Sequence, residues 1–319
     1  MLPYDVLCIG SATVDHFLKV ETSLSKIELG DKIKVPELAT FSGGGATNAG
    51  VALAKLGVKT KILTKLGNDH AADIVEKELK IFGVQNICKT RSRKNTDSAT
   101  ILSFSQDKDR VIFVHKGASQ ELALADWEAA PKQMQWIYLA SLTGPAFHLA
   151  RKIAAFALKS EIKLLLNPSS YLAQNGKKHL HHLLQATTVL VLNKEEAQAL
   201  VGKKSVPSVL LTLLSQQGPQ TIVITDGPRK IFASHQGKQY FLTPPVVAVK
   251  DTTGAGDAFA AGLLAGMIKK HSFTDALRLG QVNALGVLQH FGAKYRLLSE
   301  KEGKEWIKRY RIKVMILKK

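Results

Sequence analysis

The chain has 319 residues, of which 45% are hydrophobic and 22% are charged. That length and composition suit one large α/β domain or two ordinary ones with a sizeable core, and they argue against intrinsic disorder. Cys8 and Cys88 are too few for a disulfide-rich secreted scaffold and fit a reducing cytoplasm. The 44 Lys and Arg against 26 Asp and Glu give a net charge of +18. This surplus indicates an anionic partner (nucleic acid, a membrane surface or a small anionic substrate) or a solvated basic surface.

Neither membrane insertion nor secretion is predicted. No apolar run approaches the roughly 18 residues that a membrane-spanning helix needs. The N-terminus, residues 1–5, has no basic start and passes directly into a predicted strand, so we expect no signal peptide. We therefore expect a cytoplasmic protein.

The first part of the chain begins with a predicted strand at residues 4–9, which Gly10 ends. An irregular stretch with short alternating pieces follows from about residue 13 to residue 41. A Gly-rich turn, Gly43-Gly44-Gly45, then leads into a helix of small residues. The regular elements predicted after this turn are a helix at 47–56, a strand at 60–66 and a helix at 70–82.

Two stretches of alternating hydrophobicity come next, at residues 98–105 and 110–115, separated by a polar turn. They predict a β-hairpin, which departs from the strand–helix alternation on either side. The segments at about 13–41 and 93–116 are too short to form a core of their own. We expect them to pair in space into a small β lid over one end of the main domain.

The alternation of strands and helices then resumes and continues to residue 289. It predicts a central, mostly parallel sheet that helices cover on both faces. The predicted strands are 136–140, 163–166, 188–192, 221–225, 230–234 and 239–242, and the predicted helices are 146–159, 176–185, 194–200, 207–216, 257–269 and 273–289. The last segment, residues 301–319, is amphipathic and basic, and we expect a C-terminal tail that forms an extra strand or a docking segment. One domain over residues 1–319 accounts for the whole pattern.

The strongest chemical signal lies at residues 251–262, where Gly254, Ala255 and Gly256 precede a predicted helix. Backbone N–H groups at a helix start can point at an anion, aided by the helix dipole. Asp257 stands at the same helix start and would repel a resting phosphate. It suits a base that removes a proton from a hydroxyl while the N–H groups neutralise a moving phosphoryl group. An ordinary Gly-rich turn with an Asp cap is the alternative.

A second signal is the stretch from Ser42 to Asn48, in which three glycines let the backbone approach a ligand and Asn48 offers both a donor and an acceptor. A flexible turn before a helix explains this stretch equally well. It is not a Rossmann fingerprint, because Asn48 stands at the place of the third glycine. No Gly-Lys pair in the chain is followed by Ser or Thr, so there is no Walker A loop either.

Together these two stretches resemble the paired signatures of the PfkB carbohydrate kinases, also called the ribokinase family. They lie roughly 200 residues apart in the usual order, and the resemblance spans about residues 4–295. Gly50 is a departure, because Ser, Thr or Ala is usual there. The resemblance implies a ribokinase-like three-layer α/β/α fold with a central mostly parallel sheet and a small β lid. The matching positions are Asp251 to Leu264 in the C-terminal signature, and Gly43, Gly44, Ala46, Asn48, Gly57 and Gly67 in the N-terminal one.

The resemblance also implies roles for single residues. Asp257 would be the catalytic base and Gly254, Ala255 and Gly256 the anion hole. The remaining positions are Asp15, Gly44 and Asn48 for the substrate; Asn193, Thr225, Gly227 and Asn283 for the nucleotide; Glu196 for Mg²⁺, through water; and Asp251 and Thr253 for a monovalent cation, commonly K⁺. For Asn193 and Glu196, capping of a helix is the alternative.

The activity that follows is in-line transfer of the ATP γ-phosphoryl group to a hydroxyl, with Mg²⁺ as cofactor. A small sugar is narrowly favoured, because Asp15 and Asn48 can grip vicinal hydroxyls. A nucleoside is the alternative and would need lid residues to stack on a base, for which Phe17, Phe104 and Phe113 are candidates.

A regulator that binds sugar or nucleotide without catalysis is a further alternative, against which the intact Asp257 argues. We expect no specific nucleic acid and no membrane as partner. By resemblance alone, a homodimer through the lid sheet is expected. The cluster of His179, His181 and His182 predicts a solvated helix face, since no acidic or Cys partner stands at metal-ligand spacing.

Overall fold

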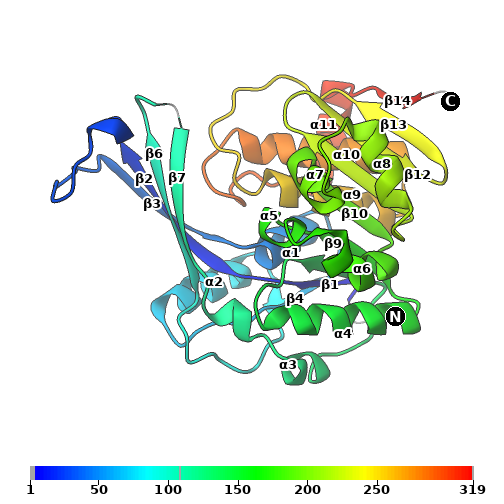
Figure 1. Cartoon of the computed structure of the whole chain (residues 1–319), viewed down its shortest axis with the longest axis horizontal. Coiled ribbons are helices and arrows are strands. Elements are labelled where there is room, and N and C mark those ends of the chain that lie inside the picture. The colour runs from blue at the N-terminus through cyan, green and yellow to red at the C-terminus, as the bar shows by residue number, and fades with distance from the viewer. Residues whose placement is uncertain (1–3, 108, 318–319) are drawn as a thin grey trace.

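The computed structural model describes residues 4–107 and 109–317. Its main sheet has ten strands in the described part of the chain, in the order β14-β13-β12-β11-β10-β9-β8-β1-β4-β5 (Figure 1). Neighbouring strands from β5 to β11 pair in parallel, and β11 to β14 pair antiparallel. The strands are β1 (Val6–Ile9), β4 (Thr60–Leu63), β5 (Gln85–Asn86), β8 (Trp136–Ala140), β9 (Lys163–Asn167), β10 (Val189–Asn193), β11 (Thr221–Asp226), β12 (Lys230–His235), β13 (Lys238–Leu242) and β14 (Val314–Leu317).

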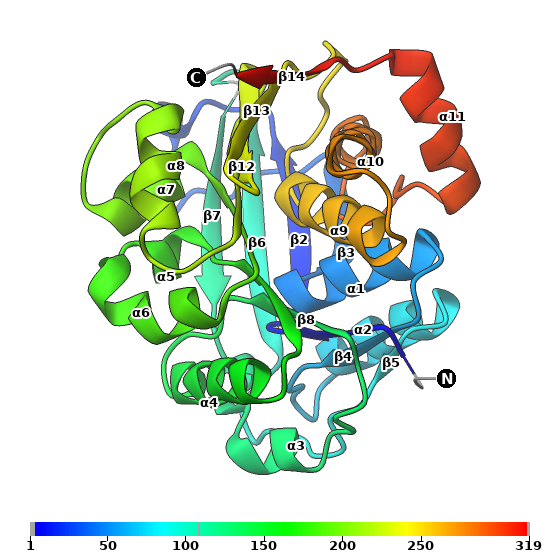
Figure 2. The same cartoon turned by 90° about the vertical axis from the view of Figure 1, so that its right-hand side faces the viewer.

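Helices cover both faces of this sheet and complete a three-layer α/β/α arrangement (Figure 2). The predicted ribokinase-like α/β fold is therefore confirmed. One face carries α1 (Gly45–Lys55), α2 (His70–Ile81), α9 (Ala255–Ile268), α10 (Phe273–Leu288) and α11 (Glu300–Tyr310). The other carries α3 (Leu124–Glu128), α4 (Ala146–Lys159), α5 (Ser170–Ala173), α6 (Gly176–Ala186), α7 (Lys194–Val201) and α8 (Pro207–Ser215).

The continuous apolar runs of the parallel strands reflect burial on both faces. In β1, Val6 and Cys8 pack into the core beneath α1, α9 and α10, whereas Leu7 and Ile9 pack into the core on the side of α4 and α6. Side chains alternate across a strand, so each strand contributes to two separate hydrophobic cores. The two cores hold the ends of these strands in place, and the strand ends position the residues of the site.

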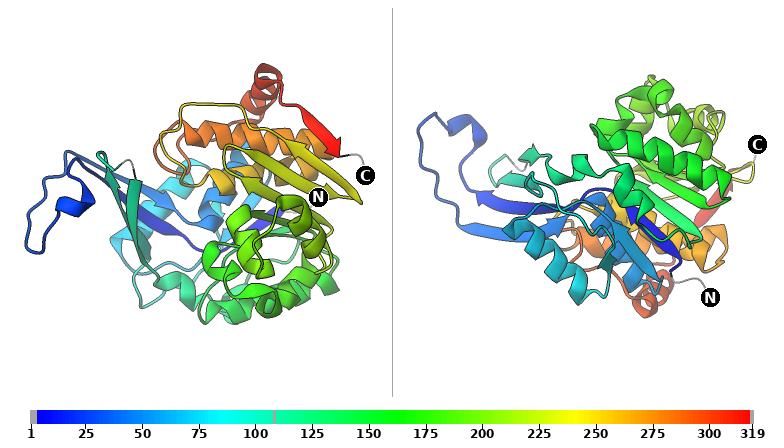
Figure 3. Two further views of the ribbon diagram at one scale, coloured as in Figure 1. Left: turned by 45° about the horizontal axis from the view of Figure 1, so that its top comes forward. Right: turned by 90° about the horizontal axis from the view of Figure 1, so that it is seen from below.

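A second sheet projects from the body beside the end of β1 (Figures 1 and 3). Its strand order is β3-β2-β6-β7. The two segments singled out in the sequence pair with each other, because β2 lies parallel to β6, while β6 and β7 form the expected hairpin. The bounds are β2 (Thr13–Val20), β3 (Glu37–Gly43), β6 (Asp97–Phe104) and β7 (Asp109–His115).

Two segments differ from the sequence-based expectation. Helix α9 begins at Ala255, before the predicted start at residue 257, because Gly254 takes the left-handed conformation with φ of 76° and caps the helix. Residues 301–317 form most of α11, a helix that the sequence analysis does not predict, and then β14, which is the expected extra strand. β14 pairs antiparallel with β13 and extends the main sheet. An apolar run at Val314–Leu317 next to an open strand edge explains this pairing.

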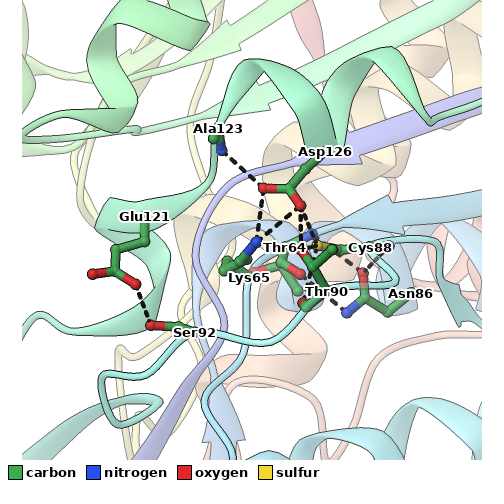
Figure 4. A network of polar contacts seen from close by, with 9 residues as sticks. All are labelled: Thr64, Lys65, Asn86, Cys88, Thr90, Ser92, Glu121, Ala123 and Asp126. Atoms are coloured by element: carbon green, nitrogen blue, oxygen red, sulfur yellow. Dashed lines mark hydrogen bonds and ion pairs between the residues drawn. The ribbon is translucent and has the colours of Figure 1, made fainter.

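A buried ion pair ties the end of the sheet to α3 (Figure 4). Lys65, just after β4, donates hydrogen bonds to both carboxylate oxygens of Asp126 at 2.9 and 3.0 Å. Thr90 donates to the same carboxylate, and the Cys88 thiol lies 3.5 Å from it. The backbone N–H of Ala123 donates to Asp126 at 3.0 Å, which caps α3. This network has a structural role, since it lies outside the cavities described below.

Candidate active site

A cavity of about 400 Å³ opens at the carboxyl ends of the parallel strands. In open α/β sheets ligands bind at this edge, because the connections to the helices diverge there. The lid borders the same cavity through Thr13, Ala99, Val114 and Lys116. The residues that line it from the strand ends are Ser11 after β1, Ser141 after β8, Asn167 in β9, Asn193 in β10 and Thr225 in β11.

Asp257 lies in the first turn of α9 and faces this cavity. The side-chain amide of Asn48 donates a hydrogen bond to Asp257 Oδ2 at 2.9 Å. The Tyr138 hydroxyl donates to Asn167 Oδ1 at 3.0 Å and lies 3.5 Å from Asp257 Oδ1. Burial raises the pKa of Asp257 to about 6, and the Asn48 and Tyr138 contacts and the charge of Lys294 oppose that rise. The carboxylate is therefore poised to exchange a proton near neutral pH.

Gly254, Ala255 and Gly256 surround the N-terminus of α9, with Gly254 as the cap. Gly254 and Gly256 line the first cavity, while Ala255 and Gly256 line a second one of about 310 Å³. A side chain at Gly254 would place its Cβ 2.3 Å from the Cβ of Ala293, so only glycine fits there. The start of this helix lies between the two cavities, where an anion passing from one to the other would meet its N–H groups; the Ala255 N–H donates to the Thr252 carbonyl at 3.3 Å.

The predicted substrate residues lie on the β2, β3 and α1 side. Asp15 is 8% exposed, accepts a hydrogen bond from Thr13 Oγ1 at 2.9 Å and packs against Gly43. Gly44 has φ of 97°, and a Cβ there would lie 2.5 Å from the Ser11 carbonyl oxygen. Asp15, Gly44 and Asn48 do not line the 400 Å³ cavity, which Thr13 and Gly45 border on this side. They form the layer directly behind its wall.

The second cavity lies between β11 and α10 and is mostly apolar. Thr225 borders both cavities, and Gly227 borders the second, where the sequence predicts nucleotide contacts. Apolar walls of this kind suit a planar aromatic ring. Its apolar lining residues are Ile231, Val246, Val247, Val249, Phe259, Ala284, Leu285 and Leu288.

Asn283 is a correction to the sequence-based assignment. Its amide donates to the Ala258 carbonyl at 2.8 Å, and its oxygen accepts from the Leu298 N–H at 3.1 Å. The side chain is fully buried, and the neighbouring Gln281 and Ala284 line the second cavity in its place. The Asn283 side chain holds α10 to α9 inside the core, and because it is fully buried and does not line the second cavity, it is not placed to contact a nucleotide there.

Asn193 and Glu196 form the helix cap that the alternative sequence-based interpretation predicts. Asn193 Oδ1 accepts from the Glu196 N–H at 2.8 Å, and Glu196 Oε2 accepts from the Asn193 N–H at 2.9 Å, so together they cap α7. Both residues also line the first cavity. The Ser170 hydroxyl donates to the remaining Glu196 oxygen at 3.3 Å.

Asp251 lies beside the anion-hole segment, and both oxygens of its carboxylate already accept hydrogen bonds from the protein. One carboxylate oxygen accepts from the Thr253 N–H at 3.0 Å and its hydroxyl at 2.8 Å, and the other accepts from the Gly292 N–H at 3.1 Å. Arg110 of the lid strand β7 reaches across, with its guanidinium 3.5 Å from Asp251 and donating to Thr252 Oγ1 at 2.9 Å. The lid thus touches the segment that precedes the anion hole.

Among the residues that the structure describes, no group of three or more His, Cys, Asp and Glu side chains could hold a metal ion. Within residues 4–107 and 109–317, no helix has the length and apolar character to cross a membrane. Of the predicted histidine face, His179 stacks on Phe147 with ring centroids 4.3 Å apart.

The fold agrees with the protein family to which the sequence is similar. Residues 4–300 match the model described as pfkB family carbohydrate kinase. The chain belongs to this family. The pfkB family kinases to which it is similar are ATP-dependent phosphotransferases that include ribokinases and nucleoside kinases.

Relatives of this pfkB family chain include the ribokinase of Haemophilus influenzae, 25% identical over 94% of this chain and 97% of that protein. The nucleoside kinase of Methanocaldococcus jannaschii is also 25% identical, over 96% of this chain and 98% of that protein. Among solved structures, the Arabidopsis thaliana ribokinase complexed with ribose and ATP has a TM-score of 0.80 at 21% identity, covering 97% of this chain and 99% of that one. This structural likeness concerns the fold.

The sequence of this pfkB family member did not single out Lys294. Lys294 is 5% exposed, donates to the Ser42 carbonyl at 2.7 Å and to its hydroxyl at 2.5 Å, and pairs with Glu78 at 3.1 Å. Arg110 and Lys116 were not identified from the sequence either. In a chain with a net charge of +18, no sequence feature marks a single Lys or Arg as part of a site, and only its burial or its partners in the structure do so.

Proposed function

We propose that this kinase transfers the γ-phosphoryl group of ATP to a hydroxyl of a small sugar, with Asp257 as the base that accepts the hydroxyl proton. The observation that carries the proposal is the position of Asp257. It is buried at the N-terminus of α9, where one cavity meets the strand ends and a second, apolar cavity adjoins. An acceptor in the first cavity and a nucleotide in the second would meet at this helix start.

The residues divide the reaction as follows. Asp257 takes the proton as the acceptor oxygen attacks the γ-phosphorus and ADP leaves. The N–H groups around Gly254, Ala255 and Gly256 donate to the phosphoryl oxygens as charge moves between them. The Tyr138 hydroxyl stays protonated, because burial and the Asp257 charge raise its pKa, and it donates its proton to Asn167 Oδ1 at 3.0 Å with Asp257 Oδ1 at 3.5 Å.

Asp15 and Asn48 would bind the hydroxyl groups of the acceptor. Asn48 Oδ1 is buried and has no hydrogen-bond partner among the described residues. A buried acceptor without a partner is costly in a finished fold, and a substrate hydroxyl would satisfy it. Asp15, behind the wall beside Thr13, adds a carboxylate that can accept from a neighbouring hydroxyl. Gly44 keeps the turn close to Ser11, which lines the cavity.

For Mg²⁺ the donor set fits. Glu196 presents a carboxylate at the cavity wall, and no rigid protein cage surrounds it in the described residues. Mg²⁺ usually keeps several waters and binds one or two carboxylates together with substrate phosphates. When bound, the ion would neutralise charge on the ATP phosphates, with Glu196 holding it through water and Asn193 orienting Glu196.

A monovalent cation at Asp251 and Thr253 fits less well. Both Asp251 oxygens already accept N–H or O–H donors, and the Arg110 guanidinium supplies a positive charge 3.5 Å away. We therefore propose no role for K⁺ in the reaction.

A nucleoside is the second candidate acceptor, and a third cavity favours it. This cavity of about 540 Å³ shares Val114, Lys116, Thr143 and Tyr171 with the first one. The stacked rings of Phe147 and His179 line it. A ribose in the first cavity could therefore carry a base into the third. Of the lid aromatics considered from the sequence, Phe104 is buried, Phe17 packs on Phe41, and Phe113 does not line the cavities.

Two further points belong to the proposal. A homodimer through the lid is supported by the exposed apolar side chains of Leu38, Ile112 and Phe113. A cytoplasmic location is supported by the two free cysteines, Cys8 and Cys88.

The deciding experiment is a coupled assay for ADP release over a panel of sugars and nucleosides, with Mg²⁺ present. Activity with a pentose or hexose that disappears in the Asp257→Asn variant supports the proposal. Activity confined to nucleosides would replace it with the second candidate. If no acceptor in the panel is phosphorylated, the kinase proposal in this form fails and a regulatory role takes its place.

A further inference from the structure

Strand β7 of the lid contacts the segment that precedes the anion hole through Arg110. The Arg110 guanidinium donates to Thr252 Oγ1 at 2.9 Å and lies 3.5 Å from Asp251 Oδ1. Asp251 and Thr252 are adjacent residues, and the planar guanidinium fork carries enough donors to bridge them. The contact joins residues that are 142 positions apart along the chain. It therefore couples the position of the lid to that of the helix start, which follows at Gly254.

Asp251 is a residue at which the family resemblance implies a monovalent cation, and its surroundings do not suit one. Its side chain is 5% exposed. The Thr253 N–H and hydroxyl donate to Oδ1, and the Gly292 N–H donates to Oδ2. These three donors use most of the roughly four acceptor sites of a carboxylate. The Arg110 guanidinium adds a positive charge beside Oδ1, which would repel a second cation.

A buried carboxylate at this place needs a positive charge beside it. Burial of an ionised group is costly unless hydrogen bonds and a partner of opposite charge offset the cost. The negative phosphoryl group would arrive at the N–H groups of residues 254–256, which makes an uncompensated charge on Asp251 still more unfavourable. Arg110 supplies the compensating charge from the lid.

We propose that Arg110 is a positioning residue that takes the place of a monovalent cation at Asp251 and ties the lid to the anion-hole segment, so that the kinase is active without K⁺. The inference rests on the proposed phosphoryl transfer at the start of α9. Val114 of the same strand, and Lys116 just after it, line the acceptor cavity. The Arg110 contact thus positions both the wall around the acceptor and the donors that meet the phosphoryl group.

The test replaces Arg110 in two ways. Arg110→Lys keeps the positive charge without the planar fork, whereas Arg110→Gln removes the charge and keeps a polar side chain. Lys19→Gln is the matched control, because Lys19 lies in lid strand β2 and pairs with Glu37 at 2.7 Å within the lid.

Each protein is assayed with K⁺ and with tetramethylammonium as the only monovalent cation, at equal ionic strength. Transfer from radiolabelled ATP is measured directly, so that the salt acts on no coupling enzyme. Thermal unfolding in the two salts reports binding of K⁺ independently of activity, since an ion that binds the native state raises the unfolding midpoint.

We expect the unaltered protein to transfer phosphate equally, and to unfold at the same temperature, in the two salts. Arg110→Gln should lower kcat by about tenfold, less than the roughly 10²- to 10³-fold of a lost anion-hole donor, because Arg110 acts through Asp251 and Thr252. Arg110→Lys should keep more of kcat than Arg110→Gln, and Lys19→Gln should keep all of it.

The inference is overturned if K⁺ raises the activity of the unaltered protein over that in tetramethylammonium, or raises its unfolding midpoint to a plateau. An unchanged kcat in Arg110→Gln, or an equal loss in folded Arg110→Lys and Arg110→Gln, overturns it as well. If the unaltered protein phosphorylates no acceptor, the proposed function fails, while the unfolding midpoints still decide whether K⁺ binds.

Discussion

Asn48 donates its side-chain amide to the Asp257 carboxylate at 2.9 Å, although 209 positions separate the two residues along the chain. The contact joins the first helix after the Gly-rich turn to the helix that begins at the anion hole. Its consequence is chemical, because the amide stabilises the charged form of the carboxylate against burial. The two motifs that the sequence presents separately therefore meet in one site.

Replacing Asp257 with Asn should lower kcat by about 10²- to 10⁴-fold, which is the usual contribution of a general base. Asn keeps the shape of the side chain and removes its ability to accept the proton. ATP binding, measured by isothermal titration calorimetry, should stay largely intact, because the apolar cavity beside Gly227 is untouched. Retained turnover in this variant would contradict the role of Asp257 as base.

Activity should fall on the acid side as Asp257 becomes protonated. Its pKa of about 6 predicts a loss of ~tenfold in kcat/KM per pH unit below that value. The fold should not weaken for the same reason. A carboxyl whose pKa is raised on folding binds a proton more tightly in the native state, so this group adds stability as the pH falls through 6. Parallel pH series of kcat/KM and of thermal unfolding check both parts, and a coincident loss of structure and activity near pH 6 would contradict them.

Replacing Asn48 with Ala should move the acid limb of kcat/KM to higher pH, since Asp257 loses a hydrogen bond that lowers its pKa. The acceptor KM should rise in the same variant, because the partnerless Oδ1 is removed with the amide. A pH series at several acceptor concentrations separates the two effects. An unchanged acid limb would show that the Asn48 contact does not tune the base.

Replacing Gly254 with Ala should abolish most of the activity. The new Cβ would lie 2.3 Å from Ala293 in a residue with φ of +76°, so the helix start must move. Gly202→Ala is the matched control, because Gly202 has the same φ of +76° but nothing within 4 Å of the added atom. Both variants should lose about 1 kcal/mol of stability from backbone strain. Only Gly254→Ala should lose activity, measured as kcat, and equal losses in both would contradict the packing argument.

Replacing Lys65 with Met should lower the free energy of unfolding by about 3–5 kcal/mol, because the buried Asp126 carboxylate then has no cation. The double variant Lys65→Met with Asp126→Asn should recover much of that loss, since no unpaired charge remains and the Asn side-chain oxygen can still accept from the Ala123 N–H that caps α3. Urea unfolding measures the difference. If the double variant is as unstable as the single one, the ion pair is not the reason for the destabilisation.

The positions of many helices and strands follow from the local pattern of apolar residues in the sequence. The helix at residues 146–159 and the strand at 136–140 lie where the sequence predicts them, because apolar periodicity reflects burial directly. Gly50, the departure in the N-terminal signature, also has a local cause that the structure reveals: a Cβ there would lie 2.6 Å from Ile62. The short helix at 124–128 was not predicted, and the extra strand at the C-terminus was predicted without its place in the sheet, since each depends on a partner elsewhere.

The sequence by itself determined the order of strands and helices, the Gly-rich turn and the Asp257 helix start, because each depends on residues close together in the chain. Only the tertiary structure decided what those residues face. It directs the Asn48 amide to Asp257, buries Asn283 in the core, and buries Lys294 against Glu78 and Ser42. The physical reason is that burial and charge pairing depend on distance in space, which residue type and spacing along the chain do not specify.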